Sequence, residues 1–272
     1  FSHCVPTVLS MLLDHPNSKK VNLSRWKVII GGSALSKSLL SRASKLGIRL
    51  HTAYGMSETC PFLTVADLSS TDPDTQSQTG FPGPLVDLRV VTPDMHDVPN
   101  DGKSTGEIVV KAPWLTKGYM GNPDASKDLW RNEYLHTGDV GYIRENGSLQ
   151  VTDRLKDVIK TGGEWISSLT LENIASAYLG IEEVAAIGMP NEKWGERAVL
   201  VAKLMNNAEP DLVRQDLMRK FREHVESGEI SKWAIPNHIF FVEQLPKTSV
   251  GKLDKKAIRK NVLTLKDTSN DR

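Results

Sequence analysis

The sequence predicts an α/β region, then a β-rich subdomain like a small barrel or sandwich, and finally a smaller α+β domain. A strand-helix-strand pattern runs from Trp26 to His51, and short strand-like runs broken by turns fill Gly80 to Gln150. After Trp165, helical and strand patterns alternate again. A chain of 272 residues can form two domains, since a single domain usually contains about 100 to 200 residues.

We expect a large domain over residues 1–153, divided into a strand-helix-strand unit at 1–79 and a β subdomain at 80–153, and a small domain over 154–272. The chain begins at Phe1 rather than Met, and its first residues read as the middle of a fold. The sequence therefore indicates a fragment or a processed chain.

Composition excludes several classes of protein. The formal net charge of +1 provides no overall field for binding nucleic acid or a membrane surface. No apolar run approaches the roughly 18 residues of a membrane-spanning helix. Cys4 and Cys60 alone cannot build a disulfide framework, which favours a reducing compartment such as the cytoplasm.

The first region is predicted to contain a helix over Val5–Leu13, with Val8, Leu9, Leu12 and Leu13 on its apolar face. The elements that follow are a strand at Trp26–Ile30, a helix at Leu35–Leu46 and a strand at Ile48–His51. This order implies parallel strands, whose carboxyl ends are the usual place for ligands. Two segments follow those ends, Gly31-Gly32-Ser33 and Thr52–Thr59. The first of them also fits a tight turn.

The β subdomain is predicted to contain strands at Leu85–Val91, Gly106–Lys111, Gly141–Arg144 and Leu149–Thr152, the last two joined by a hairpin at Asn146-Gly147. His136-Thr137-Gly138-Asp139 lies between strands. Two interpretations fit it. Asp139 could cap a turn, or the turn could present this carboxylate to two vicinal hydroxyls, as in a ribose.

Asp153–Trp165, DRLKDVIKTGGEW, lies at the expected domain boundary. A strand-like run containing Leu155, Val158 and Ile159 is broken by Gly162 and Gly163. Glycines permit a close approach of backbone or ligand, and an ordinary hairpin with a glycine turn fits the same pattern.

The small domain is predicted to contain helices at Leu169–Tyr178 and Asp211–Val225 and strands at Val184–Ile187, Ala198–Leu204 and Ile239–Val242. A turn-rich loop ending at Lys252 precedes a basic helix over Leu253–Lys260. Lys255, Lys256 and Lys260 are interpreted as a solvated face. Lys252 differs, since a short loop gives it reach without helical constraint.

Several motifs together resemble the adenylate-forming superfamily of acyl-CoA synthetases, luciferases and peptide-synthetase adenylation domains. The motifs are YGMSET at 54–59, GEIVVKAPWLTKGYMGNPDAS at 106–126, TGD at 137–139, DRLKDVIKTGGEW at 153–165 and PKTSVGK at 246–252. The resemblance covers essentially the whole chain and implies a carboxyl-terminal half. Members join a carboxylic acid to ATP, and their ligases then transfer the acyl group to CoA.

The resemblance also implies a role for each matching residue. The implied nucleotide-binding residues are Gly31, Gly32, Ala53, Tyr54, Gly55, Ser57, Asp139 and Arg154. Glu58 would hold Mg²⁺, Lys252 would stabilise charge during adenylation, and Lys156 would be the hinge between domains. Gly162, Gly163 and Trp165 would line the CoA channel, a role that would explain glycines which a plain hairpin does not need.

One departure from the family is the absence of its Gly/Ser/Thr-rich phosphate-binding loop with a lysine. We therefore expect that the chain alone cannot form an acyl-adenylate and that its partner is the amino-terminal half of the same protein. The chain most resembles ligases for medium- or long-chain fatty acids, through GGSAL at 31–35, WIS at 165–167 and GIEEVAAIGMPNEKWGER at 180–197. This resemblance implies that the enzyme uses ATP, Mg²⁺ and CoA. A luciferase-like enzyme, a peptide-synthetase domain and a non-catalytic AMP-binding module are the alternatives.

Overall fold

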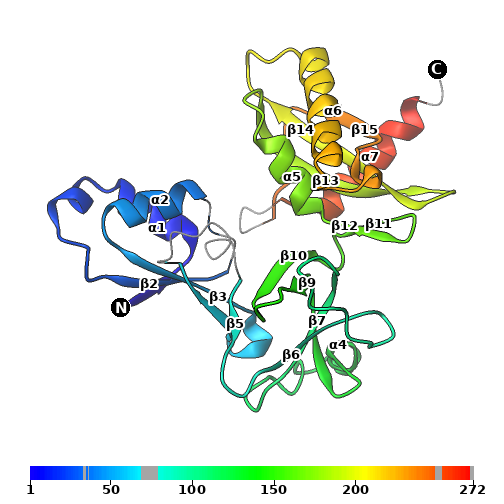
Figure 1. The fold of residues 1–272 in the computed structure, drawn as a ribbon. Helices are drawn as coiled ribbons and strands as arrows, with labels where there is room; N and C mark the ends of the chain where they lie inside the picture. Colours follow the sequence, from blue (N-terminus) through cyan, green and yellow to red (C-terminus); the bar gives the residue numbers. More distant parts are fainter. Residues whose placement is uncertain (33–34, 36, 69–78, 249–252, 270–272) are drawn as a thin grey trace. The chain divides into compact units, whose positions relative to one another are not determined.

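The computed structural model describes all residues except 33, 34, 36, 69–78, 249–252 and 270–272 (Figure 1). The chain divides into two compact units, Phe1–Val151 and Thr152–Arg272, here called the first and second unit. The sequence analysis placed this division after Asp153. No helix within the described residues has the length and apolar character needed to cross a membrane.

The first unit begins with a mixed five-stranded sheet. Its strands, in spatial order, are β1 (Ser2–Cys4), β2 (Lys27–Ile30), β3 (Arg49–Gly55), β4 (Phe62–Asp67) and β5 (Phe81–Pro82). β1, β2 and β3 are mutually parallel, which confirms the expected strand-helix-strand unit. β4 and β5 are antiparallel additions that the sequence analysis missed. Pairing with β4 extends β3 beyond its expected end at His51, as far as Gly55.

Helices α1 (Pro6–Asp14) and α2 (Lys37–Lys45) pack on one face of this sheet, and the short helix η1 (Pro16–Lys20) follows α1. Leu9 and Leu13, one helical turn apart on α1, are buried against β2. Val8 and Leu12 are 42% and 45% exposed, so the apolar face expected for this helix was too wide. A helix that touches the sheet along one line buries only a narrow stripe.

The second part of the first unit is the β subdomain. Its sheet has the order β10-β9-β7-β6, formed by β6 (Asp87–Val91), β7 (Gly106–Lys111), β9 (Tyr134–Ile143) and β10 (Leu149–Arg154). The short strand β8 (Trp130–Arg131) pairs with β9 and follows α4 (Pro123–Leu129). Leu85 has a φ of 64° and therefore lies in a turn, so β6 begins two residues later than expected.

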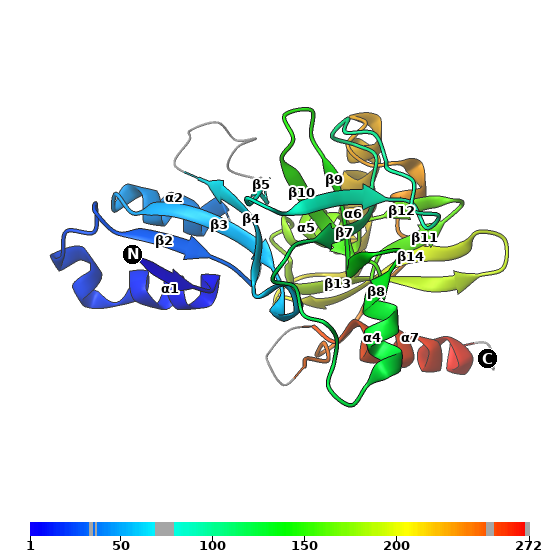
Figure 2. The same ribbon diagram turned by 90° about the horizontal axis from the view of Figure 1, so that it is seen from below.

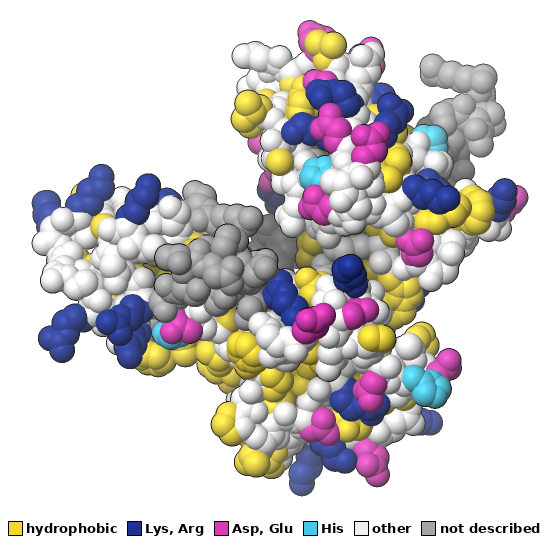
Figure 3. All heavy atoms as spheres, in the orientation of Figure 1, with side chains coloured by type: hydrophobic (Ala, Val, Ile, Leu, Met, Phe, Trp, Pro, Cys, Tyr) yellow, Lys and Arg dark blue, Asp and Glu magenta, His cyan; other side chains and the backbone are white. Residues whose placement is uncertain are grey.

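The second unit contains a sheet of five strands. In chain order its elements are β11 (Ile159–Thr161), β12 (Glu164–Ile166), α5 (Ser168–Ser176), β13 (Ile181–Asn191), β14 (Gly195–Leu204), α6 (Pro210–Glu226), η3 (Lys232–Ala234), β15 (His238–Phe241) and α7 (Lys255–Ser269). The strands pair in the order β12-β11-β14-β13, and β15 runs parallel to β14. On the face seen in Figure 3, acidic and basic side chains are interspersed over this unit.

Alternation along β13 and β14 builds two hydrophobic cores, one on each face of this sheet. Ala186 and Leu200 point toward α5 and α6, whereas Ile187 and Val201 point toward α7. Figure 2 shows α6 and α7 on opposite sides of the strands. The second unit is therefore a three-layer α+β domain, in agreement with the expected class.

Candidate functional site

Glycine residues lie at the carboxyl ends of the neighbouring strands β2 and β3. A Cβ atom on Gly31 would lie 3.3 Å from Nε2 of His3 and 3.4 Å from the carbonyl oxygen of Ala53, so the predicted adenine neighbours Gly31 and Ala53 lie side by side. Gly32 has a φ of 82°, which favours glycine. A Cβ atom on Gly55 would lie 1.6 Å from the carbonyl oxygen of Pro61, a contact that no side chain can accommodate.

The turn after β3 is held together by Thr59, which is completely buried. Its hydroxyl accepts a hydrogen bond from the Met56 N–H (2.9 Å) and donates to the carbonyl of Pro61 (2.6 Å). The turn contains the short helix η2 (Ser57–Thr59), on which Ser57 is exposed and Glu58 half-buried. Thr59 therefore fixes the backbone that carries the residues predicted to contact phosphate and Mg²⁺.

Glu58 accepts two hydrogen bonds from a second loop, the one between β7 and α4. The hydroxyl of Tyr119 donates to Oε1 of Glu58 at 2.6 Å, and the Thr116 N–H donates to the carbonyl of Glu58 at 2.9 Å. The hydrogen bond to this carboxylate raises the pKa of the Tyr119 hydroxyl. Glu58 is thus fixed at both its main chain and its side chain.

Asp139 lies on an irregularity within β9, not on a turn between strands as predicted. Glu107 pairs with Val140 and Val109 with His136, so the segment Thr137–Asp139 opposes Ile108 alone. The extra residues form a bulge, where Gly138 has a φ of 66°. The Thr137 hydroxyl donates to the carbonyl of Ile108 (2.8 Å) and accepts from the Asp139 N–H (3.1 Å), which stabilises the bulge.

The bulge aims Asp139 at the end of β3. Asp139 is 4% exposed, and its carboxylate accepts a hydrogen bond from the hydroxyl of Tyr54 at 2.8 Å. Two predicted nucleotide-binding residues that are 85 positions apart in the sequence are thus in direct contact. The first unit therefore brings together Gly31, Ala53, Tyr54 and Asp139, and the turn with Ser57 and Glu58 follows β3 directly.

In the second unit, Gly162 and Gly163 form the two-residue loop of the β11–β12 hairpin, in which Thr161 pairs with Glu164. Their φ angles of 58° and 87° match a type I′ turn, which requires positive φ at both positions. A Cβ atom at Gly162 would make only ordinary contacts, with Trp194 and Trp233. The view that a plain hairpin does not need these glycines was therefore wrong; their role in a CoA channel stays a prediction.

Three further predicted residues are described within the second unit. Arg154 ends β10 and is exposed, and its N–H donates to Oδ1 of Asp153 at 2.7 Å. Leu155 and Lys156 lie in a turn rather than in the predicted strand-like run, and the side chain of Lys156 is exposed. Trp165 is half-buried on β12, with the ammonium of Lys160 5.4 Å from its ring centroid. Lys252 lies outside the described residues.

Comparison with known proteins matches both parts of the chain to one family. Residues 1–120 match the AMP-binding enzyme family, and residues 170–252 match the AMP-binding enzyme C-terminal domain. The chain belongs to the adenylate-forming superfamily. A long-chain-fatty-acid–CoA ligase from Thermus thermophilus is 36% identical over 95% of this chain and 48% of its own length. A medium-chain-fatty-acid–CoA ligase from Ectopseudomonas oleovorans is 34% identical over 89% of this chain and 44% of its own length.

Solved structures of the superfamily share the fold. The amide bond synthetase McbA from Marinactinospora thermotolerans superposes with a TM-score of 0.77 at 26% identity, over 95% of this chain and 52% of that one. ATP-bound MatB from Rhodopseudomonas palustris gives a TM-score of 0.74 at 27% identity, over 95% and 50% of the respective chains. The chain spans about half the length of the curated relatives it matches.

The described residues fit Mg²⁺ only as one part of a site shared with ATP. No group of three or more His, Cys, Asp and Glu side chains in the described part of the chain could hold a metal ion. Mg²⁺ needs few protein ligands, however, because it is commonly held by one or two carboxylates together with substrate phosphates and water. Glu58, with Oε1 engaged by Tyr119, is a carboxylate of that kind.

The sequence analysis did not single out the residues that hold the predicted site residues in place. Thr137 and Tyr119 hydrogen-bond the predicted site residues Asp139 and Glu58, and Thr59 bonds the backbone of the turn that carries Ser57 and Glu58. In the sequence, only their places inside the quoted motifs marked them. Lys255 was interpreted as part of a solvated face, which was wrong: its side chain is 11% exposed and is ion-paired with Glu172 at 2.7 Å. Lys256 and Lys260 are exposed, as expected.

Proposed function

We propose that this chain forms the carboxyl-terminal half of an ATP-dependent acid–CoA ligase that converts a carboxylic acid into an acyl-adenylate and then into an acyl-CoA. The observation that carries the proposal is the contact between Tyr54 and the buried carboxylate of Asp139. It supplies an oriented acceptor for vicinal hydroxyls, next to a strand end where Gly31 has no side chain and Ala53 only a methyl group. Similarity to CoA ligases along 95% of the chain supports the same activity.

In this proposal residues 1–153 complete a large AMP-binding domain and residues 154–272 are a small mobile domain. Adenylation brings a carboxylate against a polyanion, so a cation must neutralise the charge that develops at the reacting phosphate. Lys252 is proposed for that task. Mg²⁺, held in part by Glu58, would supply further charge neutralisation at the phosphates. Asp139, with Arg154, would bind the ribose, and Ser57 would contact phosphate.

The second half-reaction is assigned to the second unit. Lys156 is proposed as the hinge about which the small domain turns, and Gly162, Gly163 and Trp165 as the wall of the CoA channel. The hairpin loop adds no side-chain atoms at Gly162 and Gly163, which suits the approach of a narrow pantetheine arm. The thiol of CoA would then attack the acyl carbonyl and release AMP.

The acid is proposed to be a medium- or long-chain fatty acid. Two of the similar proteins are ligases for such acids, but another, from Ruegeria pomeroyi, is a 3-methylmercaptopropionyl-CoA ligase at 34% identity. Fatty acids of graded length, with 3-methylmercaptopropionate as a short comparison, therefore form the substrate panel.

The test is acid-dependent exchange of pyrophosphate with ATP, followed by formation of the CoA thioester, in the full-length protein. We expect both steps with a fatty acid and loss of the exchange in Lys252→Ala. A protein that binds AMP but catalyses neither step would instead be a non-catalytic module. Oxygen uptake without thioester formation would indicate a luciferase-like enzyme.

A further inference from the structure

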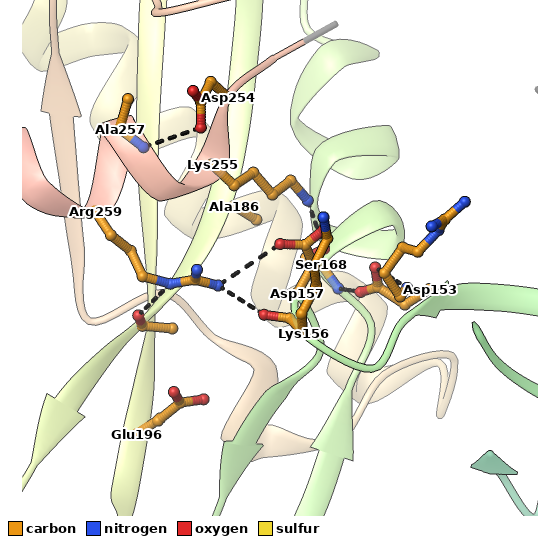
Figure 4. A network of polar contacts seen from close by, with 12 residues as sticks. Asp153, Lys156, Asp157, Ser168, Ala186, Glu196, Asp254, Lys255, Ala257 and Arg259 are labelled. Carbon is orange, nitrogen blue, oxygen red and sulfur yellow. Dashed lines mark hydrogen bonds and ion pairs between the residues drawn. The ribbon is translucent and has the colours of Figure 1, made fainter. Parts of the chain in front are cut away.

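Helix α7 is joined to the segment 153–157 by a network of polar contacts (Figure 4). The network begins at Lys255, in the first turn of the helix. Its ammonium donates to the hydroxyl of Ser168 at 2.6 Å and pairs with Oε1 of Glu172 at 2.7 Å. Burial raises the pKa of Glu172, and the charge of Lys255 opposes this rise. A buried cation and a buried anion thus fix α7 to α5.

Ser168 carries the connection onward to the predicted hinge region. Its N–H donates to Oδ2 of Asp153 at 2.5 Å, while Oδ1 of the same carboxylate accepts from the Arg154 N–H at 2.7 Å. Asp153 is 2% exposed. Because one serine bonds Lys255 through its side chain and Asp153 through its backbone, the start of α7 is linked to the end of β10.

Arg259, one turn later on α7, makes a second and more direct connection. Its Nη2 donates to the carbonyl of Lys156 at 3.3 Å and lies 3.8 Å from Oδ1 of Asp157, while Nε donates to the carbonyl of Gly188 at 3.3 Å. The planar guanidinium therefore ties the predicted hinge residue, the edge strand β13 and α7 together. Figure 4 shows these bonds converging on one side chain.

The start of α7 is also joined to the residues on both sides of the segment that contains Lys252. Asp254 donates its N–H to the carbonyl of Pro246 at 2.9 Å, and Lys247 and Leu253 form a β-bridge. The carboxylate of Asp254 accepts from the Ala257 N–H at 3.0 Å, at the start of α7. The residues on both sides of this segment are thus fixed to each other and to the helix.

We infer that Arg259 is a positioning residue that makes α7 one rigid body with the turn atoms it holds, the carbonyl of Lys156 and the side chain of Asp157. A rotation about φ of Lys156, which precedes the carbonyl that Arg259 holds, is then transmitted through α7 to Leu253 and Asp254, which follow the segment containing Lys252 in the sequence, instead of being absorbed within the small domain. The kinetic part of this inference rests on the proposed function; the mechanical part rests only on the contacts described here.

A purely structural role for Arg259 is the competing explanation, and Val262 provides its control. Val262 lies on the same helix and is buried against the sheet, but it belongs to the hydrophobic core rather than to the polar network. Val262→Ala should loosen α7 without cutting the link to Lys156. Arg259→Lys, which keeps a cation within reach of Lys156 and Asp157, provides a conservative rescue.

The first experiment measures hydrogen exchange in the 272-residue chain. The N–H groups of Asp157 and Val158 donate to the carbonyl of Arg154 and report on the turn that Arg259 holds. Relative to Val262→Ala, Arg259→Ala should accelerate their exchange about tenfold, the factor expected for loss of one hydrogen bond to a charged group. Arg259→Lys should restore part of the protection. Equal exchange in Arg259→Ala and Val262→Ala would overturn the inference.

The second experiment measures acid-dependent pyrophosphate exchange in the full-length protein. Arg259→Ala should lower kcat about tenfold with an unchanged KM for ATP, whereas Val262→Ala should change kcat much less. An active wild-type enzyme with equal kcat in the two variants would refute the positioning role. An inactive wild-type protein would refute the proposed function instead, and the hydrogen-exchange comparison would still decide whether Arg259 joins α7 to the turn.

Discussion

Removing one partner of the buried ion pair between Lys255 and Glu172 should strongly destabilise the second unit. The two side chains are 11% and 14% exposed, and Oε1 of Glu172 also accepts the N–H of Ala186 at 2.9 Å. Lys255→Met removes the cation and leaves a carboxylate in a buried site. Breaking a buried pair in this way costs about 3 to 5 kcal/mol, because the remaining charge is uncompensated.

The reasoning predicts that a second substitution recovers most of this loss. Glu172→Gln removes the stranded charge and keeps an acceptor for the N–H of Ala186. The double variant Lys255→Met/Glu172→Gln should therefore lie within about 1.5 kcal/mol of the wild type, with a coupling energy near the upper end of the usual range of about 0.5 to 3 kcal/mol. Lys256→Met, an exposed change of the same type on the same helix, should alter stability by less than about 0.5 kcal/mol.

The same pair predicts the direction of a pH effect. The pKa of Glu172 is raised in the folded protein, so the folded state binds more protons than the unfolded state between the ordinary Glu pKa, about 4.3, and the raised value. The free energy of unfolding falls as pH rises through this window. Loss of Lys255 raises the pKa of Glu172 further, so the deficit of Lys255→Met should widen as pH increases.

The measurement is urea unfolding at several pH values, with hydrogen exchange of the β13 and β14 amides as the readout. Because these strands lie in the second unit, their exchange reports the stability of that unit alone. A loss below about 1 kcal/mol in Lys255→Met, against the expected 3 to 5, would refute the reasoning. So would a double variant no more stable than Lys255→Met, or a deficit that shrinks with rising pH.

Three further predictions test individual residues. Gly163→Ala should cost about 1 to 2 kcal/mol in urea unfolding because φ is 87°, whereas Gly163→Asn should cost less than half of that; equal losses would contradict the turn assignment. Gly55→Ala should cost about 3 kcal/mol or more, because its Cβ would overlap the carbonyl of Pro61, and a wild-type melting temperature would contradict the packing described. Tyr54→Phe removes a hydrogen bond to Asp139 and should raise the KM for ATP in pyrophosphate exchange about tenfold; an unchanged KM would show that Asp139 needs no such support.

The regular parts of the fold were predictable because burial imposes a simple period. Val213, Leu217 and Phe221 are four residues apart and are all buried on α6, and the continuous apolar runs of β13 and β14 match strands covered on both faces. The Asn146-Gly147 turn was predictable for an equally local reason, because Asn-Gly favours the positive φ angles of a hairpin turn. In the structure Gly147 has a φ of 83°.

The irregular parts depended on partners distant in the sequence. Gly138 signals a local break, but only pairing with β7 makes that break a bulge within β9 rather than a turn. Lys255 reads as solvated until Ser168, 87 residues earlier, is placed beside it. The candidate site behaves in the same way, because motif spacing identified Tyr54 and Asp139 separately and their contact arises from two different sheets.

The central claim is that this chain supplies both a lysine for adenylation and a hinge for thioester formation. The most direct measurement follows the two half-reactions separately in the full-length protein, comparing Lys252→Ala with Lys156→Pro, which fixes φ near about −65° at the hinge. We predict that Lys252→Ala loses adenylation but converts a supplied acyl-adenylate into the thioester, whereas Lys156→Pro retains adenylation and loses thioester formation. Equal loss of both half-reactions in both variants would contradict the claim.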